Sequence, residues 1–180
     1  KKCKKIHTLN VYGCGKIQHK VLHSMSTNRD YSDFHLQQGV EKFCGIKRGV
    51  QALDRMFMKE TWDQYFNIFP WEDISQDSEG FDMGCGSGRW AQFVIPKVGR
   101  LNCIDPSSAI YVAESNLKKY DNAFFYKETV DACSLKNESQ DFGYSLGVLH
   151  HIPDTQKAIK DCAIKLKKGA PFLLYLYYDF

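Results

Sequence analysis

Three glycines, Gly84, Gly86 and Gly88, alternate near the middle of the chain, and an acidic residue, Asp82, stands two places before the first of them. Glycine lets the backbone turn sharply and lets a ligand approach the main chain, because no Cβ is in the way. The residues from about 90 to 95 predict a helix whose free N–H groups and positive dipole end would face the ligand. The stretch therefore predicts a strand, a tight turn and a helix that together cradle a nucleotide-like molecule.

The spacing of the glycines separates the known kinds of nucleotide loop. A dinucleotide fold uses G-x-G-x-x-G. Counted from Gly84, the third glycine would stand at position 89, which is Arg89; counted from Gly86, it would stand at position 91, which is Ala91. Some dinucleotide sites accept alanine there, so a nucleotide-dependent oxidoreductase stays open as an alternative, although the spacing weighs against it. The Gly-Lys-Ser/Thr of a phosphate-binding loop is absent from the stretch.

The pattern D-x-G-x-G-x-G resembles the first motif of class I S-adenosylmethionine-dependent methyltransferases. In that family the loop wraps the methionine half of the cofactor, and the acidic residue lies near the cofactor's amino group. The resemblance implies that five residues of this stretch bind the cofactor: Asp82, Gly84, Cys85, Gly86 and Gly88.

A second acidic residue, Asp105, follows a predicted strand over residues 101–104 and precedes Pro106. It lies about twenty residues beyond the first glycine, where a carboxylate at the end of the second strand binds a ribose. Its two acceptor oxygens match two vicinal hydroxyls. We therefore expect Asp105 and Pro106 in the ribose site, with a simple loop aspartate as the alternative, and we expect Ser107 to cap the following helix.

Two further landmarks follow in order. Asp131 and Ala132 come after a predicted strand over residues 123–126 and resemble the family's acidic-plus-small pair, which implies contacts to the adenine ring. In isolation Asp131 would be a turn residue. A fourth strand over residues 141–147 contains Leu146, another expected cofactor contact. It leads into Leu-His-His-Ile-Pro, which looks like the methyltransferase segment at the ligand-binding edge of the sheet.

His150 and His151 belong to that segment and are the candidates for acid–base chemistry. Methyl transfer from a sulfonium is an in-line displacement, so the protein mainly aligns donor and acceptor and excludes water. A hydroxyl acceptor also benefits from a general base, and a neutral histidine suits that role at cellular pH. His151 is the first choice and His150 the second. Structural histidines bonded to loop backbone are an equal alternative, and the chemistry requires no metal.

The acceptor itself is not readable from the motifs. The Asn/Asp-Pro-Pro-Tyr motif that resembles amino-methylating DNA enzymes is absent, and no Pro-Cys pair marks a cytosine-C5 enzyme. A small-molecule, sugar or lipid-precursor acceptor remains the expectation. A protein that binds S-adenosylmethionine without turnover is the other alternative.

Strands that alternate with helices predict an α/β fold, with a doubly wound, mainly parallel, Rossmann-like sheet and helices on both faces. We expect this core with its leading helices over residues 47–180, and an irregular appendage over residues 1–46. The capping-box pattern from Thr61 to Gln64 predicts the start of a short helix.

The last predicted strand, over residues 171–178, is continuously apolar, as buried parallel strands are. We expect the sheet to be truncated after this fifth strand, which would leave an unpaired apolar edge, and the chain to be part of a longer protein. The alternative is a short protein whose edge is covered by its N-terminal residues or by a partner.

The composition is that of a globular chain: 43% of the 180 residues are hydrophobic and 25% are charged. The formal charge of +3 is small, so nucleic-acid binding is not expected. No apolar run reaches membrane-spanning length. The seven cysteines are odd in number and form no C-x-x-C pair, which favours reduced thiols and a cytoplasmic setting. The sequence carries no prediction of oligomeric state.

Overall fold

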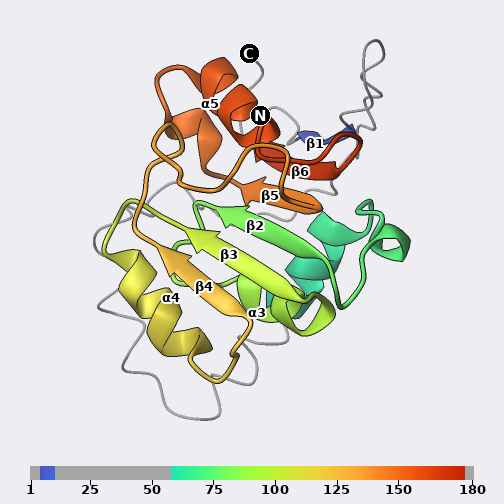
Figure 1. Cartoon of the computed structure of the whole chain (residues 1–180), viewed down its shortest axis with the longest axis vertical. Helices are drawn as coiled ribbons and strands as arrows, with labels where there is room; N and C mark the ends of the chain where they lie inside the picture. The colour runs from blue at the N-terminus through green and yellow to red at the C-terminus, as the bar shows by residue number, and fades with distance from the viewer. Residues whose placement is uncertain (1–4, 11–57, 177–180) are drawn as a thin grey trace, which may run out of the picture.

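The computed structural model of the chain describes residues 5–10 and 58–176. These residues form one six-stranded sheet with the order β1-β6-β5-β2-β3-β4 (Figure 1). The strands are β1 (Lys5–Asn10), β2 (Glu79–Met83), β3 (Arg100–Ile104), β4 (Ala123–Tyr126), β5 (Phe142–Leu146) and β6 (Pro171–Leu176).

The five strands from β2 to β6 are parallel to one another. Numbered in chain order, they lie in the sequence 3-2-1-4-5 across the sheet. This order confirms the predicted doubly wound, Rossmann-like fold. Because β2 has β3 on one side and β5 on the other, the order of the strands reverses at β2. Open α/β sheets bind ligands at such a switch point, beyond the carboxyl ends of the strands.

Strand β1 pairs antiparallel with β6, with Lys5 opposite Leu176 and Asn10 opposite Pro171. Two expectations are therefore wrong: residues 5–10 are a strand and not irregular, and β6 is not an unpaired edge. The pairing satisfies backbone groups that an edge strand would leave open. The remainder of the expected appendage, its boundary at residues 46 and 47, and the leading helical segment before residue 58 lie outside the described residues.

Helical segments cover both faces of the sheet, as predicted. One face packs against a helix over residues 58–66 and against α3 (Ala91–Val94) and α4 (Ala109–Leu117). The other face packs against α5 (Thr155–Ala163). Three 3-10 turns complete the described helical segments: η2 (Trp71–Asp73), η3 (Ile95–Lys97) and η4 (Leu149–His151). In Figure 1, α4 lies beside β4, whereas α5 lies near β5 and β6.

The helix over residues 58–66 already runs at residue 58, so the predicted helix start at Thr61 is wrong. The aromatic residues of this helix pack on the sheet. The Phe66 ring meets the Tyr144 ring edge-on with centroids 5.2 Å apart, and Trp62 is only 5% exposed. Burial of these two large aromatic side chains is expected to stabilise the helix more than a capping pattern would.

Strands β2 and β5 pack closely because each strand places a glycine opposite a phenylalanine of the other. Gly80 is the register partner of Phe142, and Phe81 is the partner of Gly143. A Cβ on either glycine would overlap the phenylalanine ring opposite it. Both phenylalanines are fully buried, so the short β2 is anchored by rings that lie over glycine backbone.

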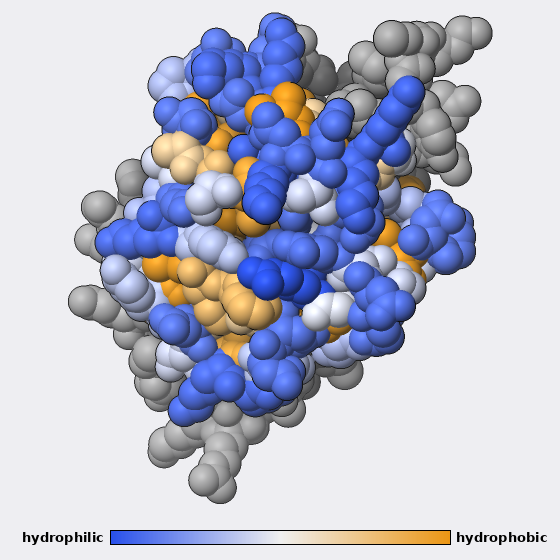
Figure 2. Space-filling model, viewed as in Figure 1, coloured by the Kyte–Doolittle hydropathy of each residue, from blue (hydrophilic) through white to orange (hydrophobic). Residues whose placement is uncertain are grey.

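The hydrophobic side chains of the sheet are largely covered. The face seen in Figure 2 is mostly hydrophilic, and its hydrophobic surface is confined to small patches. The exposed large apolar side chains of the described part are Tyr111, Phe124 and Ile164. Within residues 5–10 and 58–176, no helix is long and apolar enough to cross a membrane.

Candidate functional site

The glycine turn follows β2 at the edge where the five parallel strands end. Its three glycines, Gly84, Gly86 and Gly88, have φ values of +80°, +54° and +78°. Side chains with a Cβ rarely adopt this left-handed region, which explains the residue type. The backbone N–H groups of Gly84 and Cys85 both donate to the Ile104 carbonyl, at 2.8 and 3.0 Å. These bonds fix the turn against the end of β3.

Only one of the three glycines faces open space. A Cβ on Gly84 would lie 2.5 Å from the Val148 side chain, and a Cβ on Gly88 would lie 2.6 Å from Leu117 of α4. A Cβ on Gly86 would have no neighbour within 4 Å among residues 5–10 and 58–176. At Gly84 and Gly88, glycine is required both by the neighbouring side chains and by the positive φ, whereas Gly86 leaves space on the outer side of the turn. A ligand could therefore approach the main chain at Gly86 without meeting a side chain of the described residues.

Asp105 lies beside the turn and is engaged with it. Its Oδ2 accepts from the Gly86 backbone N–H at 2.9 Å, and its Oδ1 accepts from the Ser107 N–H at 2.9 Å and the Ser107 hydroxyl at 2.6 Å. A carboxylate offers about four acceptor positions, so one remains on Oδ2 for a ligand. The side chain is 9% exposed. Asp105 thus shapes the loop as well as being the ribose candidate, while its neighbour Pro106 is exposed.

Ser107 has a different role from the one expected. The N-cap of α4 is Ser108, and that residue makes no side-chain capping bond. The Ser107 hydroxyl donates to Asp105 and accepts from the Ala109 N–H at 3.2 Å. Its bonds therefore link Asp105 to the first turn of α4.

Asp82 stands at the end of β2, next to Met83, and is only 1% exposed. Burial raises the pKa of its carboxyl to about 8, against a lowering effect of the Tyr144 hydroxyl, and the nearby Asp105 raises it further. Desolvation disfavours the charged form of an acid. The carboxyl therefore holds a proton at neutral pH unless a cation is brought to it.

Cys85 is buried within the turn, and its thiol donates to the Gly86 carbonyl at 3.6 Å. A hydrogen bond with Cys103 and burial raise the pKa of the thiol well above its usual range. A thiol that keeps its proton is a poor nucleophile. Cys85 therefore serves the turn through its backbone and its bulk, and does not fit a covalent mechanism.

Asp131 and Ala132 lie exposed in the loop after β4. A hydrogen bond from Thr129 lowers the pKa of Asp131, so the side chain is a carboxylate at neutral pH. Among the described residues, no hydrogen bond joins this pair to the glycine turn. Their contact with adenine stays a prediction.

The histidine segment is held against the turn. Val148, which would meet a Cβ on Gly84, precedes the turn η4 that contains both histidines. The His150 and His151 rings have centroids 4.0 Å apart. Burial and the neighbouring His151 lower the pKa of His150 to about 4, which makes it neutral at cellular pH. His151 is exposed, and Leu146 at the end of β5 is half-buried against the core.

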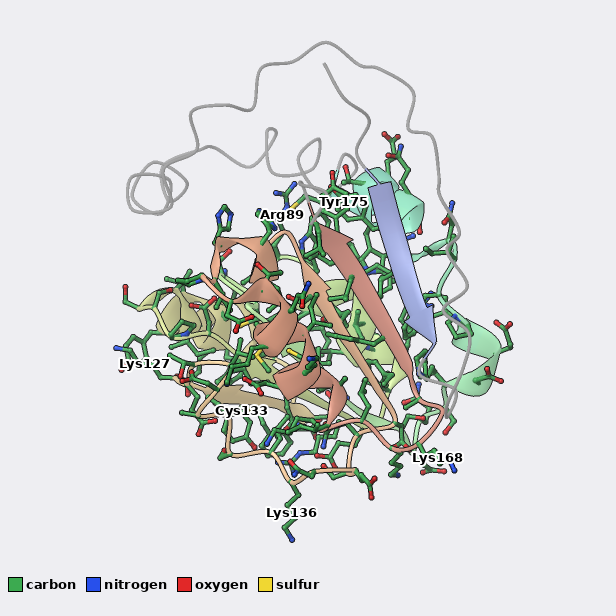
Figure 3. All side chains as sticks on the ribbon, turned by 90° about the horizontal axis from the view of Figure 1, so that it is seen from above. Arg89, Lys127, Cys133, Lys136, Lys168 and Tyr175 are labelled. Carbon is green, nitrogen blue, oxygen red and sulfur yellow. The ribbon has the colours of Figure 1, made fainter. Side chains whose placement is uncertain are left out.

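Figure 3 places Arg89, just after the turn, at the same end of the sheet as Tyr175, with Lys168 at the opposite end of β6. The glycine turn follows β2 and η4 follows the parallel strand β5, so the expected cofactor site and the histidines lie at the same end of the sheet. In the part of the chain that the structure describes, no three His, Cys, Asp or Glu side chains are arranged to hold a metal ion.

Four residues that were not expected in the site from the sequence contact its members. Asn116 of α4 donates to the Ser87 carbonyl at 3.1 Å, Ser107 binds Asp105, Val148 packs on the turn, and Tyr144 faces Asp82. The Asp-Pro-Ser sequence carries a signal for Ser107, because aspartate side chains commonly bond the backbone two residues on. The other three positions carry no local signal, since their partners are distant in the sequence.

The sequence matches a family model described as a methyltransferase domain, over residues 81–174. No curated protein matches the chain. Among solved structures, the YcgJ protein from Bacillus subtilis is similar with a TM-score of 0.56 and 23% identity, over 65% of this chain and 48% of that protein.

Two further structures carry the words SAM-dependent methyltransferase in their names. The one from Aquifex aeolicus has a TM-score of 0.52 and 17% identity, over 66% of this chain and 70% of that protein. The one from Methanosarcina mazei has a TM-score of 0.52 and 27% identity, over 59% of this chain and 57% of that protein. The chain thus spans about half the length of the Bacillus subtilis protein and somewhat more of the other two.

Proposed function

This chain belongs to the methyltransferase domain family, and from that premise we propose that it moves a methyl group from S-adenosylmethionine to a small-molecule, sugar or lipid-precursor acceptor. The single observation that carries the proposal is the space beside Gly86, where a Cβ would meet no atom of the described residues within 4 Å. That space lies at the topological switch point of the sheet, where such folds bind their ligands. S-adenosylmethionine supplies an electrophilic methyl group on a positively charged sulfur.

The residues of the turn would divide the work of binding. The backbone at Gly86 accommodates the cofactor, and Asp82 offers a carboxyl near the cofactor's amino group. Asp105, whose Oδ2 keeps one acceptor position beside its bond to Gly86, receives a ribose hydroxyl. Asp131 and Ala132 are proposed for the adenine, with Leu146 and Pro106 at the margins of the site.

Binding separates this proposal from the oxidoreductase alternative. Calorimetry of the full chain with S-adenosylmethionine and, separately, with NAD is expected to show saturable binding of the first and none of the second. Binding of NAD alone would overturn the proposal. Release of S-adenosylhomocysteine in the presence of candidate acceptors then separates an enzyme from a protein that binds the cofactor without turnover.

We further propose His151 as the general base, because it is exposed on η4 at the ligand edge. His151→Ala is expected to lower turnover roughly 100- to 10,000-fold, the usual contribution of a general base. Cofactor affinity is expected to stay near that of the wild type. Measured kcat together with calorimetric affinity checks this, and equal loss of both would make the residue structural.

Single variants distinguish the two histidines. The pKa of His150 is about 4, so His150 is neutral at cellular pH and is the second candidate for the base. Loss of turnover in His150→Ala, with turnover kept in His151→Ala, would assign the base to His150. The matched variant His150→Ala is expected to keep most of the turnover if His151 is the base.

A cytoplasmic location is part of the same proposal. The cysteines of the described residues, Cys85, Cys103, Cys133 and Cys162, are all buried free thiols. Free thiols persist in reducing compartments.

A further inference from the structure

One buried polar pair lies beneath the glycine turn. Asp82 on β2 and Tyr144 on β5 are register partners in adjacent parallel strands, so their side chains leave the sheet on the same face. Asp82 is 1% exposed and Tyr144 is fully buried. The Tyr144 ring is packed against Phe66, which keeps it in the core.

The two side chains interact without completing a regular hydrogen bond. Neither Asp82 Oδ2 nor the Tyr144 hydroxyl has a hydrogen-bond partner of regular geometry among the described residues. They nevertheless lie close enough for the Tyr144 hydroxyl to lower the pKa of Asp82, and for the Asp82 carboxyl to raise the pKa of Tyr144. Burying a polar group without a hydrogen-bond partner costs free energy. A small movement that forms a regular hydrogen bond between the Tyr144 hydroxyl and the Asp82 carboxyl would therefore stabilise the pair.

Among the residues that the structure describes, no other side chain compensates a charge on Asp82. The titratable groups that face the pair are Cys85 in the turn, Cys103 on β3 and Asp105 beyond it. Two are protonatable thiols and the third is an acid whose oxygens are bonded to Gly86 and Ser107. Within residues 58–176, no cationic side chain is among the groups that change the pKa of Asp82. Tyr144 is thus the described side chain that favours the ionised form of Asp82.

We propose that Tyr144 is a positioning residue for cofactor binding: its hydroxyl donates to the Asp82 carboxylate and holds it ionised when the cationic amino group of S-adenosylmethionine arrives. This role rests on the proposed function. Asp82 gives up its proton to solvent, the carboxylate then carries the charge that pairs with the ammonium, and Tyr144 keeps its own proton throughout. Cofactor binding by the chain is therefore linked to the release of one proton.

The direction of the pH dependence follows from the burial of Asp82. Its pKa of about 8 in the ligand-free chain means that the ionised form, which pairs with a cation, is the minor form at neutral pH. Affinity for S-adenosylhomocysteine, which carries the same amino group, is expected to rise with pH, to reach half of its plateau near pH 8, and to level off about one unit above that. Removal of the Tyr144 hydroxyl disfavours the ionised form, so the midpoint moves to higher pH.

Tyr144→Phe is the test, because it removes one oxygen and keeps the ring on Phe66. The midpoint of the affinity profile is expected to rise by about one pH unit, which weakens binding close to tenfold on the rising part of the profile. Calorimetry in buffers of different ionisation enthalpy is expected to show proton release. A merely structural role would weaken binding by the same factor at every pH.

A second measurement needs no cofactor. Carbon NMR of aspartate-labelled ligand-free protein, with Asp82→Asn to assign the signal, is expected to show Asp82 titrating at higher pH in Tyr144→Phe than in the wild type. Tyr126→Phe is the matched control, because the Tyr126 hydroxyl binds Arg100 at 3.0 Å and not Asp82. An unchanged Asp82 titration in Tyr144→Phe would overturn the role of Tyr144.

The outcomes separate the two proposals. If the wild type fails to bind S-adenosylhomocysteine, the proposed function falls and the cofactor step falls with it. If the wild type binds but Tyr144→Phe has the same pH midpoint, or no proton is released, the role of Tyr144 alone is overturned.

Discussion

The Gly86→Val variant is expected to lose affinity for S-adenosylmethionine by more than about 100-fold, which corresponds to roughly 2.7 kcal/mol. Two effects combine. The branched side chain would project into the space beside the turn, where a Cβ now meets nothing within 4 Å and where the ligand is proposed to lie. In addition, φ at this position is +54°, a conformation that a β-branched residue adopts only with strain. Calorimetric titration of the full chain measures the loss.

Gly169→Val is the matched control for the strain. Gly169 has φ +85° and lies in the turn before β6, at the opposite end of the strands from the glycine turn. Both variants are expected to lose about 1–2 kcal/mol of unfolding free energy, but only Gly86→Val should lose the cofactor. Cofactor affinity that survives in Gly86→Val would remove the turn from the binding site.

The elements that the sequence predicted correctly are those with local signals. The strand at residues 101–104 precedes Asp105 and Pro106, and β6 is a continuous apolar run, so the signal for each strand lies in neighbouring residues. In the structure, Asp154 is the N-cap of α5 and accepts from the Lys157 N–H at 2.8 Å. Order and spacing of such elements were enough to predict the doubly wound sheet.

The elements that the sequence did not predict depend on distant partners. Residues 5–10 become a strand because β6 offers them a paired edge, and Lys5 stands 171 positions before its register partner Leu176. The helix over residues 58–66 starts earlier than its capping pattern indicates, and its Trp62 and Phe66 side chains pack on the sheet. Neither partner is visible in a window of neighbouring residues, so local propensity was overruled by tertiary packing.

The candidate site also contains residues that the sequence identified and residues that it did not. Residue types and spacing identified the turn and Asp105, and the structure brings these together through the bond from Gly86 to Asp105. The sequence could not reveal that most acceptor positions of Asp105 are used by the protein itself. It also could not place Tyr144 beside Asp82, because only the pairing of β2 with β5 joins them.

Asp105 bonds to the protein and is also the ribose candidate. Its removal is therefore expected to change both the stability of the fold and the affinity for the cofactor. Asp105→Ala takes away three hydrogen bonds, from the Gly86 N–H, the Ser107 N–H and the Ser107 hydroxyl. We expect a loss of about 1–3 kcal/mol of unfolding free energy, because partly buried donors are left without an acceptor. We also expect S-adenosylhomocysteine affinity to fall by about 2–3 kcal/mol, or roughly 30- to 150-fold, the order for hydrogen bonds to a charged acceptor.

Asp141→Ala separates the two losses, because Asp141 plays a comparable part at the other end of the sheet. Its carboxylate accepts from the Glu79 N–H at 2.9 Å and from Lys167 at 2.7 Å. Its removal is expected to lower stability in urea unfolding while leaving cofactor affinity within about twofold, since the lost bonds lie far from the turn. If Asp105→Ala behaves in the same way, with stability lost and affinity kept, Asp105 is a loop residue. The 2′-deoxy analogue of S-adenosylhomocysteine tests the ribose contact directly. If the wild type binds S-adenosylhomocysteine more tightly than this analogue and Asp105→Ala does not, the carboxylate binds the ribose. Only the loss of a contact to the 2′-hydroxyl removes that preference.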